Sequence, residues 1–133
     1  MSPDLLQLAR DVMRAVSRRD ADALVALAQP EVEWWSFFAL GEGGAYRGHD
    51  GTRQYMRDLE DAFEVGDADV DQAIAVGDVV LLVGHIRYRG RGSGADGAVA
   101  ALWVLTFRDG KVMRFQALRD PEGTLAGLGR APG

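Results

Sequence analysis

The chain has 133 residues, no cysteine and a formal net charge of −5. This length predicts one domain, residues 1–133, large enough to fold without covalent crosslinks. The absence of cysteine excludes disulfides and thiolate chemistry, and the negative charge argues against nucleic-acid binding, which needs a basic footprint. With no signal-like start and no apolar run near the ~18 residues of a membrane span, we expect a cytoplasmic protein that does not enter the membrane.

The first third of the sequence predicts two helices. Ser2 and Pro3 are typical of an N-cap and a first helical position, so the first helix should begin there and end near Arg19. Asp20 should cap a short second helix that stops before Pro30. Apolar residues at helical spacing give the first helix a buried side, namely Leu5, Leu8, Val12, Ala15 and Val16.

The middle of the chain predicts a strand at Val32–Phe38, a short strand at Tyr46–Gly48 and a third helix from about His49 to Phe63. The acidic stretch Glu64–Asp69 is predicted as a loop, and Val70–Val76 as the next strand.

A meander of three long strands follows: Val79–Arg89, Ala98–Arg108 and Lys111–Arg119. Their β-branched and aromatic residues favour strands, and Asp109-Gly110 is a strong hairpin signal. The glycine-rich stretch Gly90–Gly97 is predicted as a hairpin loop. It connects two strands, whereas a phosphate-binding loop precedes a helix.

This order of elements, with four short phrases, resembles the SnoaL-like branch of the nuclear transport factor 2-like superfamily. The phrases are Pro30-Glu-Val-Glu-Trp34, Tyr46-Arg-Gly-His-Asp-Gly-Thr-Arg53, Gly90-Arg-Gly-Ser-Gly94 and Arg108-Asp-Gly-Lys-Val112. The resemblance implies an α+β fold in which a cone-shaped, curved, mixed sheet wraps around three helices from the N-terminal half and leaves a central pocket. Because polyketide cyclases, ketosteroid isomerases, epoxide hydrolases and proteins of no known activity share this fold, it does not fix the function.

The isomerase chemistry of that superfamily does not transfer to this chain. The positions of the isomerase base and of its two oxyanion-hole donors correspond here to Trp34, Val12 and Trp103. None of the three can take a proton or stabilise an oxyanion. We expect no cofactor and no metal, since His49-Asp50 is better interpreted as a helix start.

Aromatic residues are the first candidates for a ligand site. Trp34 and Trp103 fall at pocket positions in the resemblance, where they either line the pocket or fill the core. Phe115 shares one predicted strand face with Met113, Ala117 and Arg119. Tyr55 and Tyr46 are expected near the pocket, either with a hydroxyl directed inward or as packing residues whose hydroxyl reaches water. The candidate ligand contacts are therefore Trp34, Tyr46, Tyr55, Arg87, Trp103 and Phe115.

Arg119 and His85 are the candidate catalytic residues. Arg119 at the end of an apolar face could bind a carboxylate or an enolate-like oxygen, or could pair with Asp120 or Glu122 at the rim. Polarity predicts that Ile86 and Tyr88 face the core and His85 faces solvent.

The resemblance suggests the opposite orientation of that strand, with His85 and Arg87 facing the pocket. An inward His85 could act as a general base, because histidine changes its charge near neutral pH.

The sequence thus predicts a protein that binds a small, apolar or amphipathic molecule carrying an anionic or carbonyl group. If it is an enzyme, we expect cofactor-free isomerase, cyclase or lyase-type acid–base chemistry; a non-catalytic carrier and a protein-interaction module are the alternatives. An outer sheet face bearing Val80, Leu82, Leu102 and Val104 predicts a homodimer.

Overall fold

The structure, a computed structural model, describes residues 4–36, 45–90 and 96–119, with the side chains of residues 63–66 and 119 outside that description. The described residues form three helices and six strands, which confirms the predicted α+β class. In order they are α1 (Leu5–Ser17), α2 (Ala21–Leu27), β1 (Ala28–Ser36), β2 (Ala45–Arg47), α3 (Gly48–Ala62), β3 (Phe63–Val76), β4 (Val79–Gly90), β5 (Asp96–Arg108) and β6 (Lys111–Arg119).

Aspartate side chains cap the first two helices. The Asp4 carboxylate accepts a hydrogen bond from the backbone N–H of Gln7 at 3.2 Å, so Asp4 is the N-cap of α1 and the prediction of Ser2 was wrong. Asp20 accepts from the backbone N–H of Ala23 at 3.1 Å and caps α2, as predicted. Both carboxylates satisfy an N–H that has no partner within its helix, and both lie at the positive end of the helix dipole.

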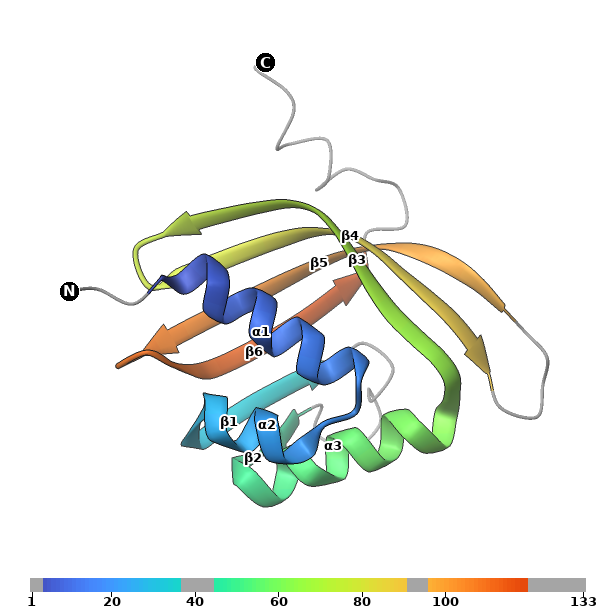
Figure 1. Cartoon of the computed structure of the whole chain (residues 1–133), viewed down its shortest axis with the longest axis horizontal. Coiled ribbons are helices and arrows are strands. Elements are labelled where there is room, and N and C mark those ends of the chain that lie inside the picture. Colours follow the sequence, from blue (N-terminus) through green and yellow to red (C-terminus); the bar gives the residue numbers. More distant parts are fainter. Residues whose placement is uncertain (1–3, 37–44, 91–95, 120–133) are drawn as a thin grey trace, which may run out of the picture.

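The strands hydrogen-bond in the order β2-β1-β6-β5-β4-β3. Strands β1 and β6 are parallel, and the other neighbours are antiparallel, so the sheet is mixed. Figure 1 shows that it is strongly curved and open, with α1 lying across it. The cone-shaped architecture implied by the resemblance is therefore confirmed.

The acidic stretch predicted as a loop belongs to β3, which pairs with β4 from Phe63 to Val76. Cross-strand pairing explains the error. Asp69 lies opposite His85 and Asp67 opposite Arg87, so basic residues on the neighbouring strand face the acidic ones. Residues of low strand propensity are tolerated because their charges are compensated.

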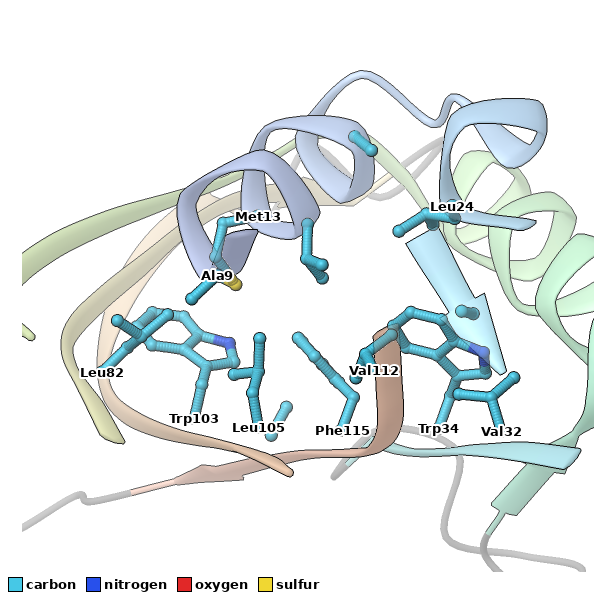
Figure 2. Close-up of a cluster of buried hydrophobic side chains, with 14 of the residues drawn as sticks. Ala9, Met13, Leu24, Val32, Trp34, Leu82, Trp103, Leu105, Val112 and Phe115 are labelled. Atoms are coloured by element: carbon cyan, nitrogen blue, oxygen red, sulfur yellow. The ribbon is translucent and has the colours of Figure 1, made fainter. Parts of the chain in front are cut away.

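Side chains from the sheet and from α1 meet in one core, shown in Figure 2. Alternate residues of β4 and β5 point into it, among them Leu82, Trp103 and Leu105. Val80 and Leu82 are therefore core residues, and their predicted place on the outer face was wrong. The predicted outer positions of Leu102 and Val104 agree with their half-buried state outside the core cluster.

Candidate functional site

Four aromatic rings pack together where β1, β2, α3 and β6 converge. The ring centroid of Trp34 lies 5.9 Å from that of Tyr55 and 5.2 Å from that of Phe115. Tyr46 stacks on Tyr55 with centroids 5.0 Å apart and planes 25° apart. The structure thus brings together four of the residues predicted as ligand contacts, and their rings form one packed apolar cluster.

Trp34 is held in the core by a hydrogen bond from its indole ring. It is fully buried, and its Nε1–H donates to Thr52 Oγ1 at 2.7 Å. The Thr52 hydroxyl in turn donates to the Gly48 carbonyl at 2.8 Å, one turn earlier in α3. Because its only polar group has a partner, Trp34 can stay in the core without a desolvation penalty. It forms a fixed wall of the aromatic cluster.

The hydroxyl of Tyr55 marks a polar corner beside these rings. Tyr55 is only 3% exposed, and burial raises its pKa to about 12 although a hydrogen bond from the Ser36 hydroxyl and the charge of Arg19 act in the opposite direction. Ser36 is itself buried at the end of β1. Tyr55, Ser36 and Arg19 define what we call the tyrosine corner.

At neutral pH the tyrosine corner contains a protonated phenol, an alcohol and a guanidinium. The Ser36 O–H donates to the Tyr55 oxygen, so the phenol and the guanidinium are the donors of the corner for a further oxygen, and the guanidinium adds a positive charge. Such a set suits a carbonyl oxygen, an enolate or a carboxylate. Among the described residues, the buried polar side chains are Ser36 and Thr52, so no buried carboxylate there offers itself as a base.

Tyr46 occupies the edge of the cluster. Its hydroxyl donates to Asp58 Oδ2 at 2.6 Å, and Gln54 donates to the other oxygen of the same carboxylate at 2.6 Å. Burial, and then the bond to Asp58, raise the pKa of Tyr46 above its ordinary value. Its hydroxyl is thus bonded to a residue of α3, while its ring stacks on the ring of Tyr55.

Trp103 lies away from this cluster. It is 2% exposed and sits opposite Leu82 on the neighbouring strand. In Figure 2 it lies below Ala9 and Met13 of α1, with Leu105 and Phe115 between it and Trp34. The two tryptophans that the resemblance places in one pocket therefore fill opposite ends of the core.

The three positions that correspond to the isomerase machinery are apolar and buried. Val12 and Trp34 are fully buried, and Trp103 nearly so. The nearest acid on β1, Glu33, pairs with Arg47 and Arg114 instead. A hydrogen bond from Trp35, followed by these charges, lowers the Glu33 pKa and keeps it ionised. It is not a candidate base for the core.

His85 and Arg87 lie on the outer face of the sheet. The His85 side chain is 54% exposed, and its Nδ1 is 3.2 Å from Asp71 Oδ2. Arg87 binds Asp69 through Nε at 2.7 Å. Polarity therefore predicts the orientation of β4 correctly, and the inward orientation implied by the resemblance is wrong for both residues. The structure gives no support to His85 as a base or to Arg87 as a ligand contact in the core.

Arg119 ends β6, where its backbone pairs with Ala101 of β5. Its side chain lies outside the description, as do Asp120 and Glu122, so its predicted role stays a prediction. No three His, Cys, Asp or Glu side chains gather as metal ligands within the described residues. In the same part of the chain, none of the helices is long and apolar enough to cross a membrane.

Ser36 and Arg19 did not stand out in the sequence. Ser36 carries a usable signal, because it continues the alternation of Val32 and Trp34 on the inner side of β1. Arg19 follows a helix end and carries no such signal. Its position depends on a left-handed backbone conformation with φ 55°, which is uncommon for a residue other than glycine.

The curved, open, mixed sheet with α1 lying across it has the nuclear transport factor 2-like class of fold, which solved structures of such proteins share. The SnoaL-like domain matches residues 9–115, and the chain belongs to this family.

Solved structures of low sequence identity share the fold over nearly the whole chain. A nuclear transport factor 2-like protein of unknown function from Burkholderia pseudomallei is 23% identical, with a TM-score of 0.78 and coverage of 95% of this chain and 97% of that one. TerC, crystallised with polyporic acid, is 22% identical, with a TM-score of 0.76 and coverage of 96% and 97%. A protein from Shewanella denitrificans that is described as a SnoaL-like polyketide cyclase is 17% identical, with a TM-score of 0.77 and coverage of 98% of this chain and 100% of that one. A search of the curated proteins finds no match.

Proposed function

We propose that this SnoaL-like protein binds a small, largely apolar molecule through an anionic or carbonyl oxygen at the tyrosine corner. The observation that carries the proposal is the buried Tyr55 hydroxyl, flanked by Ser36 and Arg19 at the end of an aromatic cluster. The rings of Trp34 and Phe115 would contact the apolar body of the ligand, and the corner would hold its oxygen. Arg119 keeps its proposed role as a second cation for that oxygen.

One of the comparisons is compatible with such a ligand. TerC was crystallised with polyporic acid, whereas a protein with a ketosteroid isomerase-like fold from Catenulispora acidiphila was solved in complex with trimethylamine, an amine without an acid or carbonyl group. At 22% and 17% identity these proteins share the fold with this chain, and their ligands only motivate a choice of compounds. Organic acids and ketones with one or two rings match the corner and the cluster best.

The corner favours binding or oxyanion stabilisation over proton abstraction. Tyr55 is protonated at neutral pH because its pKa is about 12. It can therefore donate to a developing enolate, as a cofactor-free isomerase, cyclase or lyase requires, but it cannot serve as the base. A carrier needs only the donors and the apolar surface, so a cytoplasmic carrier is the alternative to an enzyme.

Isothermal titration calorimetry with a panel of aromatic acids, steroids and polyketide-like ketones tests the proposal. Removing the donor in Tyr55→Phe should weaken the best binder at least about tenfold, since a hydrogen bond to a charged group contributes ~1.5–3 kcal/mol. Tyr88→Phe removes a hydroxyl from β4 as a matched control and should not change the affinity. Equal affinities of the wild type and Tyr55→Phe would contradict the proposal.

The outer face of the sheet supports a second proposal, a homodimer. Apolar residues follow one another across the strands, with Ile74 opposite Leu81, and Leu81 opposite Val104. Ile74 is 41% and Val76 is 63% exposed. We define the outer apolar face as Ile74, Val76, Leu81, Leu102, Val104 and Leu118.

Such a face would be buried favourably against a second copy. Sedimentation velocity should show a dimer that Leu102→Lys with Val104→Lys converts to a monomer, whereas Ala26→Lys on the exposed side of α2 leaves it intact. A wild-type monomer at all concentrations would exclude this proposal.

A further inference from the structure

Three arginines line one groove on the surface, between the turn that joins α1 to α2 and the length of α3. They are Arg19, Arg53 and Arg57, and the groove has a volume of about 390 Å³. Ala21, Met56 and Glu60 complete its lining. We call it the arginine groove. It differs from the rest of the molecule in charge, because the chain as a whole carries −5.

Arg19 is fixed on one side of the arginine groove by the end of α1. Its Nη1 donates to the carbonyls of Val16 at 3.1 Å and Ser17 at 3.2 Å. Carbonyls at a helix C-terminus attract cations, because they form the negative end of the helix dipole. The guanidinium is therefore held in place before any ligand arrives, and this lowers the entropy cost of binding.

The other two arginines have partners that an anion can replace or join. Arg53 Nη1 lies 2.8 Å from Asp22 Oδ1, and the Asp22 side chain is 86% exposed. Such solvent-exposed pairs are weak. Arg57 donates through Nη2 to Gln54 Oε1 at 2.8 Å, a neutral acceptor. The three guanidiniums outnumber the two carboxylates named here, those of Asp22 and Glu60, so the arginine groove carries a net positive charge.

We propose that the arginine groove binds a small molecule bearing a carboxylate or a phosphate. Arginine recognises both groups through paired N–H donors, and three arginines from two segments can surround one such group. Met56 and Ala21 give the ligand an apolar contact beside the charge. The volume falls within the range of small-molecule sites. The arginine groove shares Arg19 with the tyrosine corner, but Arg53 and Arg57 belong to the groove alone, and the proposal does not rest on the function proposed for the corner.

Backbone amide NMR of the full chain, titrated at constant ionic strength, tests the proposal with two probes, inorganic phosphate and benzoate. We expect saturable shifts at the α1–α2 turn and along α3. The double variant Arg53→Gln with Arg57→Gln should weaken binding at least tenfold. Arg14→Gln is the matched control. It removes one positive charge from α1, where Arg14 lines a different groove, and should leave the affinity unchanged.

Two results would overturn the proposal. One is the absence of saturable shifts at these amides with either probe. The other is a loss of affinity in Arg14→Gln as large as in the double variant, because that would show a general response to net charge. The exposed positions of Arg53 and Arg57 on α3 make folded variants attainable, and their amide spectra report this directly. A preference for benzoate over phosphate, or the reverse, identifies which of the two groups the arginine groove takes.

Discussion

The tyrosine corner and the outer face of β3 and β4 both collect polar groups, but the two regions hold them in opposite environments. Tyr55 and Ser36 are buried beside aromatic rings. His85 and Arg87 are more than half exposed and face carboxylates on the neighbouring strand. The more familiar catalytic residue types are therefore on the outside, and the inner site consists of hydroxyl groups with a guanidinium.

The environment decides which of these groups matters for a ligand. In the core a hydrogen bond is strong and an unsatisfied polar group is costly, so the proposed ligand binding should depend strongly on Tyr55. On the outer face water and salt screen the charges, and each pair contributes little. Residue type alone is thus a poor guide to the site of this fold.

The largest expected effect is a difference in the free energy of unfolding between variants of two adjacent tryptophans. Trp34→Ala should lower the free energy of unfolding by about 3–5 kcal/mol, because it empties a fully buried position and leaves Thr52 without its donor. Trp35 lies half-buried on the opposite side of β1, and Trp35→Ala should cost about 1 kcal/mol. Urea unfolding followed by circular dichroism measures both. Similar losses in the two variants would contradict the described orientation of β1.

A medium effect concerns the pH dependence of stability. The folded-state pKa of Tyr55 is about 12, above the ordinary value of 10. The folded protein therefore holds this proton more tightly than the unfolded chain. Its contribution, about 2–3 kcal/mol, is complete below pH ~10 and is lost as the pH rises toward ~12.

Urea unfolding at several alkaline pH values measures this slope, to which Tyr46 also contributes because its pKa is raised as well. Tyr55→Phe should flatten the slope. An unaltered slope in Tyr55→Phe would mean that its hydroxyl is not buried in solution.

The smallest effect is expected on the outer face. His85→Ala breaks an exposed pair with Asp71 and should change the free energy of unfolding by less than about 1 kcal/mol. It should also leave ligand affinity at the tyrosine corner unchanged in calorimetry. A tenfold loss of affinity, or loss of an activity found later, would restore His85 as a functional residue.

Local signals were enough to predict most of the fold. Asp109-Gly110 sets the β5–β6 hairpin through two consecutive positive φ angles, 52° and 76°. Helix α3 lies within one residue of its predicted bounds. The start of β3 was missed because acidic residues there suggest a loop, and only the facing residues of β4 make them compatible with a strand.

The candidate site was predicted in part. Trp34, Tyr46, Tyr55 and Phe115 come together because helix and strand periodicities place each on an inner side. Arg19 could not be found this way, since its contact with the core depends on a turn conformation that its neighbours do not encode in any simple pattern. The separation of Trp103 from Trp34 likewise depends on the curvature and register of the whole sheet.

The crystal structure of the protein grown with its tightest-binding acid is the most direct test of the tyrosine corner. We predict an acid oxygen within hydrogen-bond distance of the Tyr55 hydroxyl, with the ligand body against Trp34 and Phe115. A ligand bound only outside the core, with no contact to the Tyr55 hydroxyl, would contradict a binding function for this corner.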